Sequence, residues 1–431
     1  MVFSNNLLFG LGGQTPGPAT FDSTLIGNSV WFDGSADYMD KTFSSGSAQS
    51  RIVYACWLQR NDFTRLQSIF TANKGGRADR FGFQADDTID IHLEQSGGST
   101  IIYSTSNVFR DTGWYHFILS IDLNVIQANA VQLYVNGVPN NVTVTFGPSA
   151  GALSTMDSFG NSGIHAIGKR GGASDRFSNT YQTQCTFLVG QSIQNGDVAV
   201  TDFLDTFTFG TNGSQFIPKS DANIAALAST AGGNSFCLDF ANSSDLGNDI
   251  SSNNNNFATD STGSTIAAAN QSTSTPSLTF STYNILDANP AYTSTNDGAN
   301  TYVVTNVAGA GIRATLPMTS GKWYWEQRNG GSNECGPAIS AGAGFVNLAT
   351  NSIIGEGSGS HSCYLDLNGT VRINASTGSS IGITNGSTAV MGVAFDADTG
   401  KVWFRDSSGF GSSGDPANGT NAHATLATTS A

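Results

Sequence analysis

The stretch Trp114–Asp122, with the sequence WYHFILSID, decides the fold of this chain. Every second residue from Tyr115 to Ile121 is apolar, and Trp114 and Ile118 add apolar residues to the other face. The segment Ile52–Leu58, IVYACWL, has the same pattern. A period of two with two apolar faces is typical of a central β-strand that is covered on both sides. We therefore expect both segments in the middle of a sheet.

Working outward, other short segments also have strand and turn patterns. Thr88–Glu94 alternates polar with apolar residues, which predicts a strand with one solvated face. Asn-Gly pairs, the strongest short hairpin signal, follow strand patterns at 136–137 and 368–369. Only Asp221–Thr230, and one further turn at Thr201–Phe203, has a helical pattern. The sequence thus predicts an all-β protein of two antiparallel β-sandwiches with very little helix.

The composition narrows the classes of function. Of 431 residues, 39% are hydrophobic but only 12% are charged, about half the usual ~25%. Phe, Trp and Tyr suffice to build a core, which argues against wholesale disorder. The formal net charge is −14, and 18 Lys and Arg spread thinly along the chain form no basic face. Nucleic acid and anionic membrane surfaces are therefore not expected partners.

The composition also predicts how the chain is divided. Asn242–Pro276 consists almost entirely of Asn, Ser, Thr, Ala, Gly and Asp, which predicts a linker or a connector that follows the surface. We expect sandwich domains at 1–245 and 277–431, separated by a polar linker at 246–276. No apolar run is long enough for a membrane span, and the first residues lack a secretory signal. The five widely spaced cysteines are expected to be buried free thiols, as in a protein made in a reducing cytoplasm.

Segments of the first domain resemble, in a shared order, the concanavalin A-like, laminin G-like domain of tailed-phage structural and tail-fibre proteins. The closest match is Phe109–His116, FRDTGWYH, followed by Leu133–Gly137, LYVNG. The other matching segments are NNLLFG at 5–10, SVWFDGSADY at 29–38, CWLQR at 56–60, HAIG at 165–168, DF at 202–203, FIPK at 216–219 and GNSFCLDF at 233–240. The resemblance covers residues 3–256 and implies a jelly roll whose two ends pair, so that Val30–Phe32 and Phe236–Phe240 are neighbours.

The second domain resembles a SPRY-like sandwich. The segments that carry this resemblance are SGKWYWE at 320–326, MGVAFDADTGKVWF at 391–404 and GDPANGTN at 414–421. In place of the family's usual Lys-Asn-Gly turn the chain has Arg405–Gly409, and it ends at Ala431, where the family continues with at least one more strand. We expect the native chain to continue or a neighbour to supply a strand, and the alternative is that Thr420–Ala431 folds back as an edge cover.

The pairing of these two modules is typical of marine-phage virion proteins. The resemblance implies a non-enzymatic virion structural protein, such as a fibre, tail or capsid-decoration subunit. Its expected partners are other virion proteins and copies of itself, with a trimer favoured, and a host-surface glycan or protein receptor is left open. The alternatives are a glycan-binding adhesin module of a cellular secreted protein and a polysaccharide-degrading enzyme.

The sequence offers little for catalysis. Glycosidases of concanavalin-type folds need two carboxylates that face one cleft, and no strand here carries their Glu-x-Asp-x-x-Glu motif. Asp90 and Glu94 share a face, which we interpret as a solvated strand face, with a catalytic pair as the weaker alternative. None of the histidines lies in a metal-binding or triad motif, and His116 is expected to be structural.

Binding sites are the better prospect. Asp239, Asp245 and Asp249, with Asn242 and Asn248 between them, place hard oxygens in one short segment, the ligands that Ca²⁺ prefers. We interpret the three aspartates as a candidate calcium site, against the alternative of surface turns without metal; Asp86-Asp87 is a weaker candidate.

Two glycine-rich loops, 73–80 and 169–176, gather the scarce positive charge. We expect them to pair with acidic side chains, or else to contact a neighbouring subunit or an acidic glycan.

Overall fold

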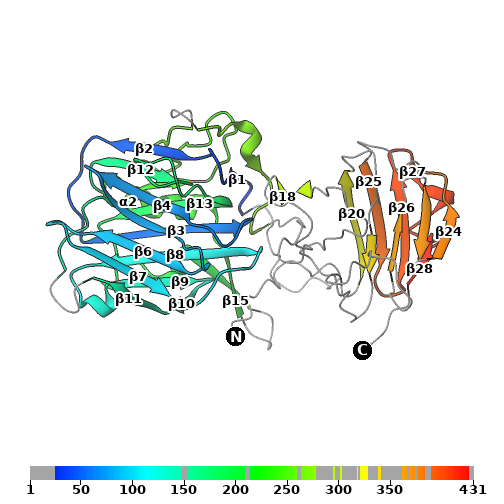
Figure 1. The fold of residues 1–431 in the computed structure, drawn as a ribbon, viewed down its shortest axis with the longest axis horizontal. Coiled ribbons are helices and arrows are strands. Elements are labelled where there is room, and N and C mark those ends of the chain that lie inside the picture. The colour runs from blue at the N-terminus through cyan, green and yellow to red at the C-terminus, as the bar shows by residue number, and fades with distance from the viewer. Residues whose placement is uncertain are drawn as a thin grey trace. The chain divides into compact units, whose positions relative to one another are not determined.

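The structure is a computed structural model, and it describes residues 25–147, 153–208, 214–259, 264–277, 295–296, 301–302, 318, 321–328, 338–340, 362–365, 369–373, 376–383 and 390–426. The chain forms two compact units (Figure 1), of which the first contains the described residues up to 277 and the second those from 295 onward. The expected sandwich and linker boundaries stay predictions. Segment 246–276 belongs to the first unit, because Phe257 and Ile266 lie in its core.

One sheet of the first unit has eight strands in the order β10-β9-β8-β3-β13-β1-β17, with β16 also paired to β13. Its strands are β1 (Ser29–Asp33), β3 (Arg51–Arg60), β8 (Trp114–Asp122), β9 (Val131–Val135), β10 (Val138–Asn140), β13 (Asn179–Val189), β16 (Phe236–Leu238) and β17 (Gln271–Ser272). All pairings in it are antiparallel.

The other sheet has seven strands in the order β11-β7-β6-β5-β4-β12-β2, again antiparallel. Its strands are β2 (Met39–Phe43), β4 (Gln67–Lys74), β5 (Arg77–Phe83), β6 (Ile89–Glu94), β7 (Thr100–Thr105), β11 (Val142–Phe146) and β12 (Gly163–Ile167). Aromatic and aliphatic side chains from both sheets form one core between them. The fold of this unit is therefore the expected antiparallel sandwich.

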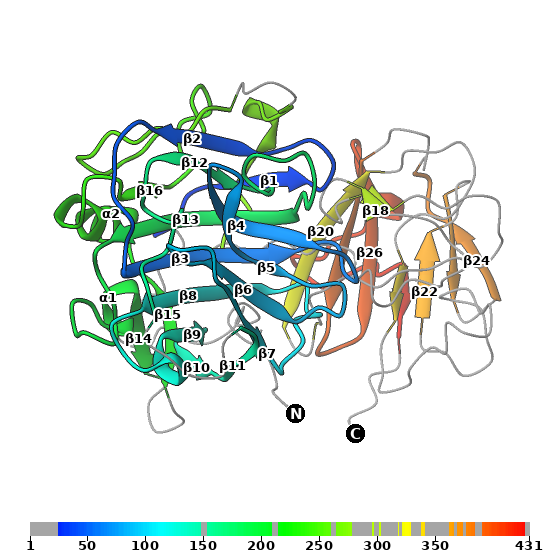
Figure 2. The same cartoon turned by 60° about the vertical axis from the view of Figure 1, so that its left-hand side comes forward.

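The two central strands are buried on both faces, as their sequences predict. In β8, Phe117 and Leu119 point into the core between the sheets. Trp114 and Ile118 point the other way, into a second cluster beneath the helices α1 (Val200–Phe203) and α2 (Asp221–Thr230) and the hairpin of β14 (Leu204–Thr208) and β15 (Ser214–Pro218) (Figure 2). Helix α2 has the bounds that its helical pattern predicts, and α1 begins one residue before the expected turn at Thr201–Phe203.

The turns also agree with the sequence. Asn136 and Gly137 have φ values of 51° and 78° and join β9 to β10, as an Asn-Gly hairpin requires. The second expected hairpin is formed by β22 (Ser362–Leu365) and β23 (Thr370–Ile373), although Asn368 lies outside the described residues.

The expectation that Val30–Phe32 and Phe236–Phe240 pair is wrong in detail. Both β1 and β16 pair with β13, at Asn179–Gln182 and Cys185–Phe187 respectively, so they lie end to end along the same side of that strand. The two strands belong to the same sheet, but they do not pair with each other. β13 is long enough to take both partners, because it spans eleven residues.

The second unit is also a two-sheet structure. One sheet contains β20 (Lys322–Arg328), β25 (Val390–Asp396), β26 (Lys401–Asp406), β27 (Gly409–Phe410) and β28 (Ala424–Thr425), and the other contains β21 (Ala338–Ser340), β22, β23 and β24 (Ser376–Ser380). Val393 and Phe404 from the first pack against Leu365 and Val371 from the second. A short separate pair is formed by β18 (Thr295–Asn296) and β19 (Thr301–Tyr302).

The described C-terminal residues fold back. Ala424 and Thr425 pair with Val402 and Lys401 of β26, and Leu426 is buried. This is the edge cover that the sequence left as an alternative, as far as residue 426. Among the described residues, no helix has the length and apolar character needed to cross a bilayer.

Candidate functional site

The two cationic loops meet on the outer face of the seven-stranded sheet. The Thr71 hydroxyl, on β4, donates to the carbonyl of Lys169 at 3.0 Å and accepts from the backbone N–H of Gly171 at 2.7 Å. A Cβ at Gly172, whose φ is +73°, would lie 3.1 Å from Cγ of Asn73. The second loop therefore lies directly against β4, and its glycines allow that close approach.

Ion pairs hold the positive charges of these loops. Arg80 bonds Asp90 at 2.6 Å with both side chains at least nine-tenths buried, and Arg77 and Arg170 bond Asp157 and Asp175 at 2.8 Å. The expected pairing with acidic side chains is confirmed for these three arginines. Lys169 instead places its ammonium 3.3 Å from the centre of the Tyr38 ring, and burial lowers its pKa.

The Arg80–Asp90 pair is incompletely satisfied. Within the described residues, Nε of Arg80 and Oδ1 of Asp90 are buried and have no hydrogen-bond partner. The carbonyl of Arg176 accepts a hydrogen bond from the Ser68 N–H at 2.8 Å. Desolvation, followed by the positive charge of Arg80, lowers the pKa of Arg176. Buried polar atoms without partners are costly, so this pair reduces the stability of the fold at this point of the face.

Next to this pair, the same face is more open. Nε2 of His92 lies 3.0 Å from Oε1 of Glu94, and the Thr100 hydroxyl donates to the same carboxylate at 3.1 Å. All three side chains are half-buried. Asp90 and Glu94 do share a face, as expected, but each carboxylate has its own partner, and only Glu94 lies where solvent reaches it.

The weaker metal candidate, Asp86-Asp87, divides into two environments. Asp86 is exposed and caps its own turn through Thr88. Asp87 is fully buried, and its carboxylate accepts from Arg60 at 3.1 Å, from Arg110 at 2.7 Å and from the Thr64 N–H at 2.7 Å. Two guanidinium groups already neutralise the carboxylate of Asp87. Its hydrogen bonds connect three segments of the chain at this end of the sandwich.

The three aspartates of the calcium prediction are differently placed. Both oxygens of the buried Asp249 accept hydrogen bonds, from the N–H groups of Cys237, Ser251 and Asn255 and from the Ser251 hydroxyl. Asp239 accepts from the Ala241 N–H, and Asp245 is half-buried. In the part of the chain that the structure describes, no three His, Cys, Asp or Glu side chains are grouped to hold a metal. The calcium site stays a prediction.

A neighbouring pair of carboxylates was missed. Asp221, at the start of α2, accepts from Gln184 at 2.7 Å, and burial together with the charge of Asp239 raises its pKa to about 6. Burial also raises the pKa of Asp239. Ser220, which caps the helix, is a sequence signal for the position of Asp221 at the start of α2. Nothing in the sequence shows that β16 ends beside this helix start.

The thiols are structural. Cys56, Cys185, Cys237 and Cys363 are free and buried, which confirms the expectation for these four, and Cys335 lies outside the described residues. Burial raises the pKa of Cys56 and Cys237, which keeps them unreactive. His116 is also buried, packs in a tilted arrangement against the Trp57 ring and has its pKa lowered by burial to about 3, as expected for a structural histidine.

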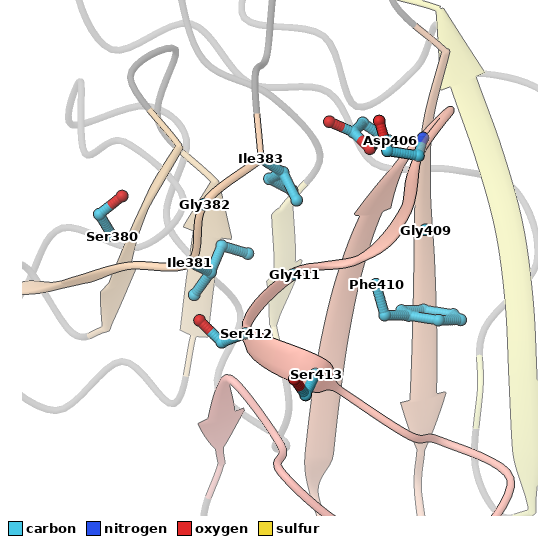
Figure 3. A pocket seen from close by; sticks show the side chains of 11 residues that line it. Ser380, Ile381, Gly382, Ile383, Asp406, Gly409, Phe410, Gly411, Ser412 and Ser413 are labelled. Carbon is cyan, nitrogen blue, oxygen red and sulfur yellow. Dashed lines mark hydrogen bonds between the residues drawn. The ribbon is translucent and has the colours of Figure 1, made fainter.

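The second unit has an open pocket of about 520 Å³ between residues 380–383 and the turn after β26 (Figure 3). Ile381 and Ile383 line one side, and Asp406 and Phe410 line the other. Serine hydroxyls, among them Ser380 and Ser412, complete it. The sequence marks the turn Arg405–Gly409 only as a departure from the SPRY-like pattern, and it does not predict a pocket there, because serine and glycine are common throughout the chain.

Comparison with known proteins agrees with the fold of the first unit. Residues 15–179 match the family model of the concanavalin A-like lectin/glucanases superfamily, in its laminin G form. With the two antiparallel sheets, this match shows a laminin G-like jelly roll in the first unit. No curated protein matches the sequence.

Solved structures with similarity to the chain share little sequence with it. Mouse laminin α1 domains LG4-5 are 9% identical, cover 93% of this chain and 81% of their own, and have a TM-score of 0.33. A putative carbohydrate binding protein from Bacteroides ovatus is 15% identical, with 45% and 51% covered and a TM-score of 0.30. The CBM40 of Ruminococcus gnavus IT-sialidase, bound to α2,3 sialyllactose, is 14% identical, with 35% and 91% covered and a TM-score of 0.23.

Proposed function

We propose that the chain is a non-enzymatic structural protein of a virion whose first unit binds a glycan on the outer face of the seven-stranded sheet. The observation that carries the binding role is the open row of His92, Glu94 and Thr100 beside the incompletely satisfied Arg80–Asp90 pair. Carboxylate, imidazole and hydroxyl groups held in place by one another suit the hydroxyls of a sugar, because little ordering entropy remains to be lost. The matched superfamily includes lectins, which supports this class of ligand.

The virion role is supported by the resemblance of sequence segments in both domains to phage structural proteins. A low-charge surface rich in Ser, Thr and Asn suits the wet, polar contacts of an assembly. We expect mass spectrometry of intact particles to detect this chain as a stoichiometric component. Its complete absence from purified particles would contradict the virion role and leave glycan binding to be judged separately.

A glycan array followed by calorimetry tests the binding role. The Glu94→Gln and His92→Ala variants are expected to weaken binding of the selected glycan at least about tenfold, the effect of losing one charge-assisted hydrogen bond. Glu326→Gln, on the exposed face of β20 in the second unit, is the matched control and should bind as the wild type does. Equal affinity of all four proteins would place the site elsewhere.

The non-enzymatic part has its own test. Incubation of the arrayed glycan with the protein should leave it intact. Hydrolysis that disappears in Asp90→Ala or Glu94→Ala would instead support the polysaccharide-degrading alternative.

A further inference from the structure

The strand β11 is an open edge with exposed apolar side chains. It ends the seven-stranded sheet, and among the described residues it pairs only with β7. Phe146 is 61% exposed and Val144 is 37% exposed. An exposed edge of this kind offers unpaired backbone N–H and C=O groups to any strand that approaches it.

The other three ends of the two large sheets, as described, are protected. β10 carries Pro139, which cannot donate to a further strand. β2 carries Asp40 and Lys41, and its Asp40 backbone is already bonded to Ala258. β17 has only two residues. Natural proteins use these same devices against edge pairing, and β11 carries neither a proline nor a charged side chain; its one irregularity lies between Val144 and Phe146.

The charge distribution indicates what kind of partner fits. From Leu123 to Met156 the chain contains no Asp, Glu, Lys, Arg or His, although its formal net charge is −14. Copies of an acidic protein repel one another over most of their surfaces, and this repulsion is smallest along an uncharged segment. A basic partner would find no opposite charge here, whereas a second copy meets no like charge.

We propose that two copies of the chain pair through β11, antiparallel and about a two-fold axis at Val144. The regular part of the strand, Val142–Val144, precedes an irregularity in the ladder, and the axis places Val144 of one copy opposite Val144 of the other, so that apolar side chains meet at the centre of the contact. Such an interface is self-complementary and closes as a dimer, which differs from the trimer implied by the phage resemblance. The inference does not depend on glycan binding.

The contact is small. A five-residue strand with a ladder irregularity between Val144 and Phe146 buries less than a standard interface. We therefore expect a micromolar dissociation constant rather than a tight dimer.

Sedimentation equilibrium of the full chain, from micromolar to submillimolar concentration, tests the proposal. The wild type should approach twice the mass of one chain. Val144→Lys and Val144→Glu should each remain monomeric, because each places like charges opposite one another at the axis. An equimolar mixture of the two variants should recover the dimer, since Lys then faces Glu; this rescue also shows that both variants are folded.

Val138→Lys is the matched control, because Val138 is 60% exposed on the protected edge β10. It should dimerise as the wild type does. The proposal is wrong if the wild type stays monomeric or forms a trimer. It is also wrong if Val144→Lys leaves dimerisation unchanged. Failure of the mixture to recover the dimer while circular dichroism shows folded variants would do the same.

Discussion

Replacing Asp87 with Asn should destabilise the first unit more than any surface charge change. Asn keeps the shape of the side chain and tolerates the backbone φ of +65° at this position, so the change isolates the charge. The Arg60 side chain, which is 0% exposed, would then be a buried cation that faces a carbonyl and the rings of Phe63 and Phe83 but no carboxylate within hydrogen-bond distance.

The structure sets the size of the effect. Removing one partner of a buried ion pair costs about 3–5 kcal/mol, because the other charge is left without compensation. The Arg110 side chain is 51% exposed, so its share of the loss should stay below about 1 kcal/mol. We therefore expect Asp87→Asn to lower the free energy of unfolding of the first unit by about 3–5 kcal/mol.

Peptide-resolved hydrogen exchange across a urea series is the assay, because it separates the two units. Peptides from β3 and β8 should lose protection at lower urea, while peptides from β25 and β26 serve as the internal reference. Asp62→Asn, which breaks the part-exposed Asp62–Arg65 pair, should cost no more than about 1 kcal/mol.

Adding Arg60→Met to Asp87→Asn should recover part of the loss, because no buried charge then remains. A cost below about 1 kcal/mol for Asp87→Asn alone would refute the reasoning.

Three other outcomes are expected. Burial lowers the pKa of His165 to about 4, so the unfolded chain takes up this proton first as the pH falls. His165 should therefore contribute a loss of about 2 kcal/mol between about pH 7 and about pH 5, in addition to the loss from the buried His116, and His165→Gln should remove its share in acid titrations followed by hydrogen exchange. Gly137→Ala should lower the free energy of unfolding in urea by at least about 2 kcal/mol, because its Cβ would lie 2.2 Å from the Phe216 ring. Gly196→Ala has open space around its Cβ, so it should lower that free energy only by the ~1 kcal/mol that a left-handed φ costs. Cys56 and Cys237 should resist maleimide in the native protein and react on unfolding, as measured by mass spectrometry of labelled peptides.

Local chemistry explains which parts of the fold the sequence predicts. The two apolar faces of Trp114–Asp122 need two covering layers, and both are present. The Asn-Gly pair and the helical pattern of Asp221–Thr230 each act within a few residues, so the turn and the helix appear where expected. The interpretation of residues 246–276 depended on composition alone. Composition does not show that a few apolar residues of this segment, Leu246, Phe257 and Ile266, pack in the core of the first unit.

The candidate site was harder to predict, because strand register and loop placement create it. Thr71 and Gly171 are a hundred residues apart in sequence, and only the antiparallel pairing of β12 with β4 brings their loops together. The alternation at Thr88–Glu94 predicts that Asp90, His92 and Glu94 share a face. It does not show that Arg80 on β5 buries Asp90 and leaves Glu94 to solvent.

The binding face and the open edge belong to the same sheet, which links the two proposals. Cross-strand neighbours point to the same side of a sheet, so pairing through β11 would place the outer faces of both copies on one side. Only β7 separates β11 from β6, the strand that carries His92 and Glu94. A dimer formed in this way would present two copies of the polar row to one surface. Two weak glycan contacts on a common support bind far more tightly than either alone, which is how a low-charge, polar site would hold a glycan-covered surface.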